Sequence, residues 1–329
     1  MSGTADALPP EFDFIARYFR PLVGPGGLDL ADDAAAFIPP AGRLLVVAAD
    51  AMVQGVHFLP DDPPETVGRK LLRVNLSDLA AMGAAPLGYL LTLAMPRDMT
   101  ENWFAGFCAG LAVDQAAFKV HLLGGDTTST PEGPLVLSLT ILGHAAPGCI
   151  LRRGGAKTGD GLWVTGTIGD GALGLAVLQG RLQLQEPKQQ DEFLADRYRL
   201  PQPRVVFGTG LHGIASAAMD VSDGLVQDCG HICRESKLSA TIEAGLVPLA
   251  PAARGAGAAW LETCLTGGDD YELLMAVPPE REAALHELSR RAGVAVTRIG
   301  RLHAGLPSVR VQNGEGTVLR FERTGWSHL

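Results

Sequence analysis

The chain has 329 residues, of which 47% are hydrophobic and 19% charged, and its formal net charge is -9. Its length allows two globular domains of ordinary size, while the negative charge argues against nucleic acid or an anionic membrane surface as a partner. No apolar run approaches the ~20 residues that a membrane-spanning helix needs. The first residues carry acids and no basic stretch ahead of an apolar one, so we expect no secretory signal and a cytoplasmic location.

In the first half of the chain, glycine and proline separate alternating strands and helices. Helices are predicted at 65–84 and at 100–118, and Thr100 is the expected N-cap of the second helix. A Gly/Thr-rich turn is expected after Asp126, and this half ends near residue 147. Apolar runs predict four strands, at 43–50, 87–96, 119–126 and 134–145.

The second half begins with a basic linker, a strand at 162–166 and a glycine-rich turn into a helix. A polar segment at 182–193 is expected to be exposed. A short strand and a turn then lead into a helix from about Ser222, and "TGGDDYELLMAVP" predicts a turn followed by a strand. A surface helix of mixed charge is predicted at 279–293.

Several neighbouring strands join through short turns, although strands also alternate with helices. This pattern favours two α+β domains over one doubly wound sheet. We place the two domains at 1–147 and 148–329.

One pattern repeats along the chain, in which a short apolar run ends in aspartate, often beside glycine, serine or threonine. Turns at strand ends are where proteins place ligand-binding side chains. Asp78 differs, because it lies in a helix with apolar residues at helical spacing, where a buried charge is costly unless it is paired or bound to metal. The residues that follow the pattern are Asp32, Asp33, Asp50, Asp126, Asp220 and Asp223.

Two interpretations of these acids remain open. Each aspartate alone fits a turn residue, a cap or the solvated edge of a helix. Together, with few basic partners nearby, they repel one another unless a cation holds them, and hard oxygen ligands suit Mg²⁺ or Ca²⁺. The second interpretation predicts a magnesium-dependent phosphate or nucleotide enzyme. No GxxxxGKS or GxxxxGKT loop is present, and "GTIGDG" resembles a phosphate-cradling loop only weakly.

Taken together, the motifs resemble those of the thiamine-monophosphate kinases over nearly the whole chain. They stand in the order of that family: "ADDAAAF", "ADAMVQGVHF", "KLLRVNLSDLAAMGAAP", "LLGGDTT", "RRGGAKTGDGLWVTGTIGDGALGL", "AMDVSDGLVQDCGHI", "GGDDYEL" and "GWSHL". "VNLSDLAAMGA", "GGDTT" and "SDGL" are partly shared with a wider superfamily that includes aminoimidazole ribonucleotide synthetase. Three motifs are more specific and indicate the thiamine branch of this superfamily: "GVHF", "GGDDYEL" and "GWSHL".

The resemblance implies an α+β fold of two α/β domains. The N-terminal domain would be ferredoxin-like, would bind metal and ATP, and would pair with a second copy in a homodimer barrel. The C-terminal domain, of the aminoimidazole ribonucleotide synthetase-like type, would cover the nucleotide and contribute to the substrate site. The implied reaction is direct in-line transfer of the γ-phosphoryl group of ATP to thiamine monophosphate, with several Mg²⁺ ions, giving thiamine diphosphate.

The resemblance also assigns roles by motif position. Asp78 would bridge more than one ion, and Asp126 and Asp220 would join it at the centre of catalysis. The implied magnesium ligands are Asp33, Asp50, Asp78, Asp126, Asp220 and Asp223. The implied ATP contacts are Gly125, Asp126, Arg153 and Ser222. The residues that would face thiamine monophosphate are His57, Asp269 and Trp326.

Four of these assignments have a structural alternative. Arg153 fits an exposed linker cation, and Ser222 fits a helix N-cap. His57 fits a histidine whose hydrogen bonds are satisfied after a strand, and Trp326 fits a hydrophobic anchor near the C-terminus. In the functional interpretation, the aromatic face of Trp326 and a nearby carboxylate both suit a flat thiazolium cation.

The sequence departs from the family pattern at three places. Ala31 replaces the usual glycine before the acidic pair, and Asp269 replaces the usual glutamate. Ala48 and Ala49 stand before Asp50, where the family carries hydroxyl side chains, so the number and affinity of bound ions are open.

Two other functions compete with thiamine-monophosphate kinase activity. A sister enzyme of the superfamily is one, but the selenophosphate enzyme needs a reactive cysteine near its N-terminus, and the first cysteine here is Cys108. The hydrogenase-maturation enzyme uses a C-terminal cysteine, whereas this chain ends in His328 and Leu329. The other rival is a nucleotide-binding dimer with impaired catalysis.

Overall fold

The computed structural model describes residues 8–184 and 188–327, and the chain divides into two compact units. Unit 1 runs to Leu79 and continues over Ala85–Pro147. Unit 2 consists of Ala80–Ala84 and the chain from Gly148 onward. In the described ranges, no helix is long and apolar enough to cross a membrane.

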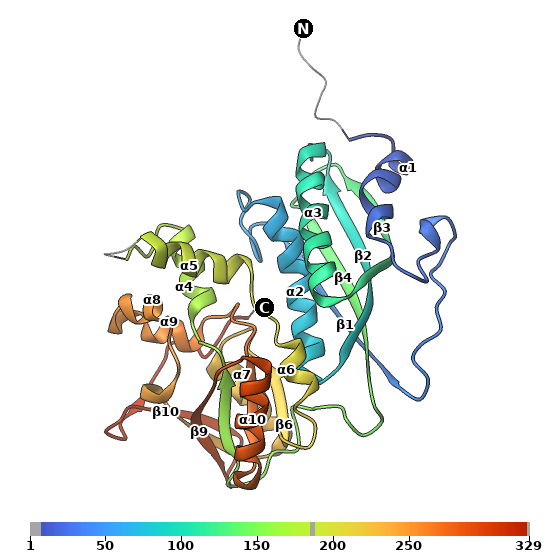
Figure 1. Cartoon of the computed structure of the whole chain (residues 1–329). Coiled ribbons are helices and arrows are strands. Elements are labelled where there is room, and N and C mark those ends of the chain that lie inside the picture. Colours follow the sequence, from blue (N-terminus) through green and yellow to red (C-terminus); the bar gives the residue numbers. More distant parts are fainter. Residues whose placement is uncertain (1–7, 185–187, 328–329) are drawn as a thin grey trace. The chain divides into compact units, whose positions relative to one another are not determined.

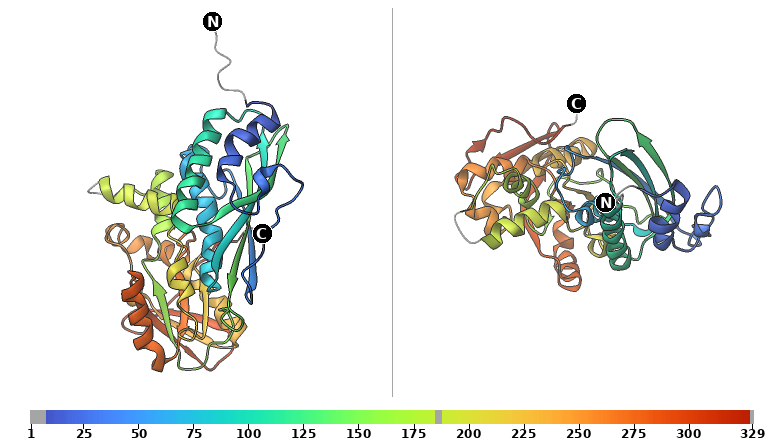
Figure 2. Two further views of the ribbon diagram at one scale, coloured as in Figure 1. Left: turned by 45° about the vertical axis from the view of Figure 1, so that its right-hand side comes forward. Right: turned by 90° about the horizontal axis from the view of Figure 1, so that it is seen from above.

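Unit 1 is built on a four-stranded sheet with two long helices along one face (Figures 1 and 2). The outer strand β1 pairs antiparallel with β4, β4 pairs antiparallel with β2, and β2 pairs parallel with β3. All four predicted strands and both predicted helices are confirmed. In sheet order the strands are β1 (Leu44–Val53), β4 (Val136–Ala145), β2 (Ala85–Pro96) and β3 (His121–Thr130), and the helices are α2 (Pro64–Ala81) and α3 (Glu101–Phe118).

Side chains alternate across this sheet as the pleat requires. In β2, Tyr89, Leu91 and Leu93 are buried, while Leu90 and Thr92 are exposed on the open face. The predicted cap of α3 is confirmed, since the Thr100 hydroxyl accepts from the backbone N–H of Trp103 at 3.2 Å.

Two expectations about unit 1 are wrong. The Gly/Thr-rich stretch after Asp126 is not a turn, because β3 continues to Thr130 in parallel pairing with β2. Asp126 and Asp50 therefore lie inside strands and not at strand ends. β1 extends past Asp50 because Ala51, Met52 and Val53 keep pairing with β4.

Unit 2 contains a seven-stranded mixed sheet, antiparallel except for the β7/β10 pair. Helix α7 (Leu225–Ser236) packs against β6, β7 and β10 and closes the core. The sheet order is β11 (Val318–Leu319), β10 (Ser308–Gln312), β7 (Ser239–Glu243), β9 (Val296–His303), β5 (Gly161–Thr165), β8 (Leu273–Val277) and β6 (Ala217–Asp220).

A second, smaller core in unit 2 joins short helices beside the sheet. Part of the polar segment at 182–193 is helical, because α5 begins at Lys188, and the predicted surface helix is confirmed as α10. The remaining helices are α1 (Glu11–Phe14) in unit 1 and, in unit 2, α4 (Asp170–Leu178), α5 (Lys188–Arg199), α6 (Val205–Thr209), α8 (Pro251–Gly255), α9 (Leu261–Thr266) and α10 (Glu282–Ala292).

Candidate functional site

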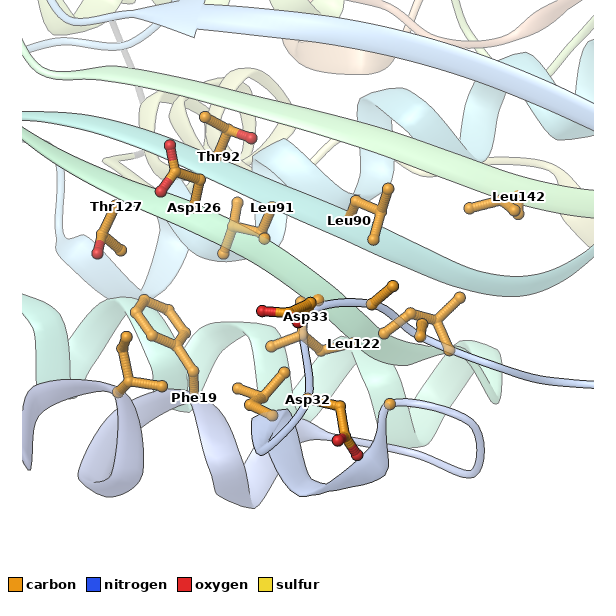
Figure 3. A pocket seen from close by; sticks show the side chains of 18 of the residues that line it. Phe19, Asp32, Asp33, Leu90, Leu91, Thr92, Leu122, Asp126, Thr127 and Leu142 are labelled. Atoms are coloured by element: carbon orange, nitrogen blue, oxygen red, sulfur yellow. The ribbon is translucent and has the colours of Figure 1, made fainter. Parts of the chain in front are cut away.

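A pocket of about 650 Å³ opens on unit 1, between the N-terminal segment and the open face of the sheet (Figure 3). It brings together three of the predicted residues, Asp33, Gly125 and Asp126. Asp32 and Thr127 also line it, and its floor is formed by apolar side chains such as Leu90. The side chains of Asp33 and Asp126 are exposed to solvent in the pocket. The pocket thus combines an apolar floor with hard oxygen donors.

The acidic pair follows a strained turn. Leu28, Asp29 and Leu30 all have left-handed backbone angles, with φ of 50°, 56° and 56°. For residues other than glycine this conformation costs about 1–2 kcal/mol each, and strain of this kind gathers at functional sites. Ala31, by contrast, has φ of -97°. The replacement of the family's glycine by Ala31 therefore requires no strained backbone here.

Gly125 is required by the sheet itself. A Cβ atom at this position would lie 1.9 Å from the carbonyl oxygen of Leu91 in the neighbouring strand. Only glycine allows β2 and β3 to pair at this point of the pocket wall. The absence of a side chain also leaves the backbone of Gly125 accessible from the pocket, where Gly125 is exposed.

Asp50 and Asp78 lie outside the lining of this pocket. By strand alternation, Asp50 shares a face of β1 with the buried Val46 and Met52, which is the face that α2 covers. Asp78 is half-buried on α2, between the buried Ser77 and Leu79. Across residues 8–184 and 188–327, no three carboxylate, imidazole or thiol groups lie close enough together to hold one metal ion.

His57 sits in the turn that follows β1. Its Nδ1 accepts a hydrogen bond from the backbone N–H of Val53 at 3.0 Å, so its proton is on Nε2. Its backbone carbonyl accepts from the Lys70 ammonium at 2.9 Å. These contacts fix the ring and agree with the structural alternative of a histidine whose hydrogen bonds are satisfied.

In unit 2, Asp220 ends β6 and is buried, as the strand-end pattern predicts. The helix after it begins at Leu225 and not at Ser222, and its N-cap is Gly224. The alternative of Ser222 as the N-cap is therefore wrong. The Oδ2 atom of Asp228 accepts instead from the N–H groups of Asp223 and Gly224, each at 3.1 Å.

Asp228 was missed by the sequence analysis. Burial first, and then the nearby carboxylates Asp220 and Asp223, raise the pKa of its carboxyl to about 8. The spacing "SDGLVQD" carries a signal for it, because an acid in the first turn of a helix can reach the free amides there.

Trp326 is held beside the same turn. Its backbone N–H donates to the Asp223 carbonyl at 2.9 Å, and its own carbonyl accepts from the Gln227 side chain at 2.7 Å. The residue is 51% exposed. Arg153, also exposed, lies near the other end of α7, where the Ser236 hydroxyl donates to its carbonyl at 3.5 Å. His328 and Leu329 lie outside the described residues.

The "GGDDYEL" segment joins α9 to β8 and packs against two other turns. Its Asp270 is buried, and it accepts from the N–H groups of Gly169 at 2.7 Å and Gly171 at 3.1 Å. These amides belong to "GTIGDG" at the start of α4. The weak likeness of that turn to a phosphate-cradling loop is thus explained by an internal carboxylate, which satisfies two of its amides.

Glu272 is the second acid of this segment that the sequence analysis missed. It is fully buried and accepts from Thr165, Arg197 and Arg204, at distances of 2.5–3.0 Å. Asp170 lies beside Arg197 with a closest approach of 3.6 Å. Burial raises the pKa of both Asp170 and Asp270. Asp269, the predicted substrate residue, is adjacent to this network.

Comparison with known proteins identifies the fold of both units. The model described as "AIR synthase related protein, N-terminal domain" matches residues 31–145, and its C-terminal counterpart matches residues 157–312. The predicted two-domain α+β fold of the aminoimidazole ribonucleotide synthetase-like type is confirmed.

Comparison with individual proteins identifies a narrower family than the two domain models do. The thiamine-monophosphate kinase of Caulobacter vibrioides is 43% identical over 99% of this chain and 93% of its own. The crystal structure of thiamine-monophosphate kinase from Stenotrophomonas maltophilia K279a is 40% identical, with a TM-score of 0.79, and covers 88% of this chain and 91% of its own. A structure described as AaThiL complexed with AMPPCP and TMP is 30% identical, with a TM-score of 0.77 and 91% coverage of each chain. The chain belongs to the thiamine-monophosphate kinase family.

Proposed function

We propose that this protein transfers the γ-phosphoryl group of ATP to thiamine monophosphate, giving thiamine diphosphate and ADP. The observation that carries the proposal is its likeness, over 91% of each chain, to the AaThiL structure described with AMPPCP and TMP. The pocket on unit 1 supports it, since carboxylates and a bare glycine backbone meet there beside an apolar floor. An apolar floor suits a nucleotide base, and the carboxylates suit metal-bound phosphates.

The pocket offers oxygen donors of the type that magnesium prefers, although within the described residues no three acids lie close enough together to hold one ion. Asp32, Asp33 and Asp126 are hard oxygen donors, and no lysine or arginine stands among its lining residues. Bound Mg²⁺ would neutralise the charge of the phosphates during transfer. The proposed ligands are Asp33, Asp50, Asp78, Asp126, Asp220 and Asp223.

The motif positions also suggest which residues would contact the substrates. ATP would contact Gly125 and Asp126 along β3, and Arg153 would offer its guanidinium fork to phosphate oxygens. Ser222, which is not needed as a helix cap, would bond the nucleotide. The proposed contacts of thiamine monophosphate are His57, Asp269 and Trp326, of which Trp326 is half-exposed.

We also propose that two copies pair through the open face of the unit 1 sheet. That face exposes Leu45 and Val47, at 47% and 59% of their surfaces. Exposed apolar strands of this kind usually find a partner. Val47→Lys should give a monomeric mass by light scattering, and Val206→Lys, at an exposed position of the mostly buried α6, should not. A dimer that survives Val47→Lys would contradict this interface.

The function is tested with purified protein, ATP, Mg²⁺ and thiamine monophosphate. Thiamine diphosphate and ADP should form in equal amounts, and chelation of Mg²⁺ should stop both. Binding of ATP without turnover would favour the impaired nucleotide-binding dimer, and ADP formation without thiamine diphosphate would favour a sister enzyme.

A further inference from the structure

The loop between α9 and β8 holds two residues in a conformation that they disfavour. Asp269 has φ of 69° and Tyr271 has φ of 52°. Left-handed backbone is rare for residues other than glycine and is an outlier for a bulky residue such as tyrosine. Such strain persists only where the surroundings impose it. Here the strain is imposed by the contacts of Asp270 and Glu272, the two residues that alternate with Asp269 and Tyr271.

Asp270 and Glu272 are those alternating residues, and both are buried, at 1% and 0% exposure. The Asp270 carboxylate is fixed by two backbone amides at the start of α4. The Glu272 carboxylate is fixed by two arginines and the Thr165 hydroxyl. Asp269 and Tyr271, in contrast, are half-buried. The loop is therefore held by every second side chain.

The backbone of the loop is held from the other side by the turn after β6. The N–H of Asp269 donates to the Ser222 carbonyl at 2.9 Å, and the N–H of Tyr271 donates to the Val221 carbonyl at 2.8 Å. Space is also limited, because a Cβ atom at Gly171 would lie 2.2 Å from the carbonyl oxygen of Asp269. Asp269 thus has little freedom to shift while Asp270 keeps its contacts.

We propose that Asp270 is a positioning residue for the substrate site: its buried carboxylate, with Glu272 anchoring the end of the loop, holds Asp269 in the left-handed conformation that presents its carboxylate to thiamine monophosphate. The inference rests on the proposed function, in which Asp269 faces that substrate. Pre-set geometry of this kind matters because a displacement of about 1 Å can cost roughly a hundredfold in rate.

The first test is Asp270→Asn. The substitution keeps the shape of the side chain, but its amide nitrogen cannot accept from Gly169 or Gly171. The KM for thiamine monophosphate should rise about tenfold, which corresponds to about 1.4 kcal/mol. The KM for ATP should change much less, because three of its four proposed contacts, Gly125, Asp126 and Arg153, lie outside this loop and the turn that holds it. Equal rises of both KM values would show a merely structural role and overturn the proposal.

A double-mutant cycle separates positioning from general damage. Asp269→Asn removes the carboxylate that is to be positioned, and asparagine tolerates left-handed backbone better than most residues. If Asp270 acts through Asp269, Asp270→Asn should add little to the KM for thiamine monophosphate in that background. Effects that multiply would overturn the proposal.

The matched control is Asp160→Asn. Asp160 is also buried, and its carboxylate accepts from the Lys157 N–H at 2.9 Å and the Ser216 hydroxyl at 2.5 Å. This variant should lower the melting temperature without a selective change in the KM for thiamine monophosphate. Should Asp270→Asn not fold, Gly171→Ala pushes on Asp269 from the same side and should raise the same KM selectively. Wild-type protein that makes no thiamine diphosphate would refute the proposed function itself, whereas an active wild type with unchanged KM values in Asp270→Asn or Gly171→Ala refutes only the positioning.

Discussion

Trp326 is tied to the first turn of α7 through its backbone, because the Gln227 side chain donates to its carbonyl at 2.7 Å. The N–H of Trp326 donates to the backbone carbonyl of Asp223, whose side chain is one of the proposed metal ligands. Gly325 allows this approach, since a Cβ atom there would lie 2.5 Å from the Cβ of Gln227. These contacts all end on the main chain of Trp326, and the residue as a whole is half-exposed.

We predict that Trp326→Ala selectively weakens the binding of thiamine monophosphate. Stacking of an aromatic ring on a cation contributes ~0.5–2 kcal/mol, so the KM for thiamine monophosphate should rise roughly threefold to thirtyfold. The KM for ATP should barely move, and the melting temperature should hold because the anchor is main-chain. Gln227→Ala is the comparison, since it loosens the anchor and keeps the indole. Equal shifts in both KM values for Trp326→Ala would exclude stacking.

Asp78→Asn is predicted to cut turnover by orders of magnitude while the protein stays folded. The amide keeps the shape of the side chain but removes the charge that would balance Mg²⁺. Turnover is measured over a range of Mg²⁺ concentrations beside a melting curve. Asp98→Asn, an exposed acid after β2, should behave as wild type. Near-normal turnover of Asp78→Asn at limiting Mg²⁺ would show that Asp78 bridges no ions.

The sequence predicted elements where one local signal decides. Thr100 caps α3 because its hydroxyl reaches an amide three residues on, and Asp220 ends its strand as the pattern required. Asp50 and Asp126 were misplaced because the ends of β1 and β3 depend on partners in other strands. Glu272 could not be found, since its arginine partners lie 75 and 68 residues away in the chain.

The alternation of side chains along β1 allows a prediction about Ala48 and Ala49, the two alanines before Asp50. Ala49 pairs with Thr140 in β4 and shares the open face of the sheet with Leu90 and Leu142, which line the pocket. Ala48 faces the opposite side. Ala49→Thr should therefore lower the Mg²⁺ concentration that gives half-maximal rate. A response of Ala48→Thr and not of Ala49→Thr would place the ion on the face of β1 that Asp50 occupies. An unchanged magnesium dependence in folded Ala49→Thr would mean that a hydroxyl there reaches no ion.

The last prediction concerns Asp228 and pH. Burial, then Asp220 and Asp223, raise the pKa of its carboxyl from 3.8 in the unfolded chain to about 8 in the fold. Between these values the folded state binds more protons than the unfolded state, so this group makes the free energy of unfolding fall as pH rises, and the loss is complete above about pH 8.

Asp228→Asn should remove this fall in the free energy of unfolding with rising pH. Both of its backbone hydrogen bonds end on one oxygen, Oδ2, which the amide oxygen can replace. With EDTA present, so that no metal occupies the neighbouring acids, melting curves are recorded between about pH 5 and 8. The variant should gain stability over wild type as pH rises, and the two should converge toward low pH, where Asp228 is protonated in both folded and unfolded wild type. A stability difference that stays constant across this range would show that Asp228 does not titrate there.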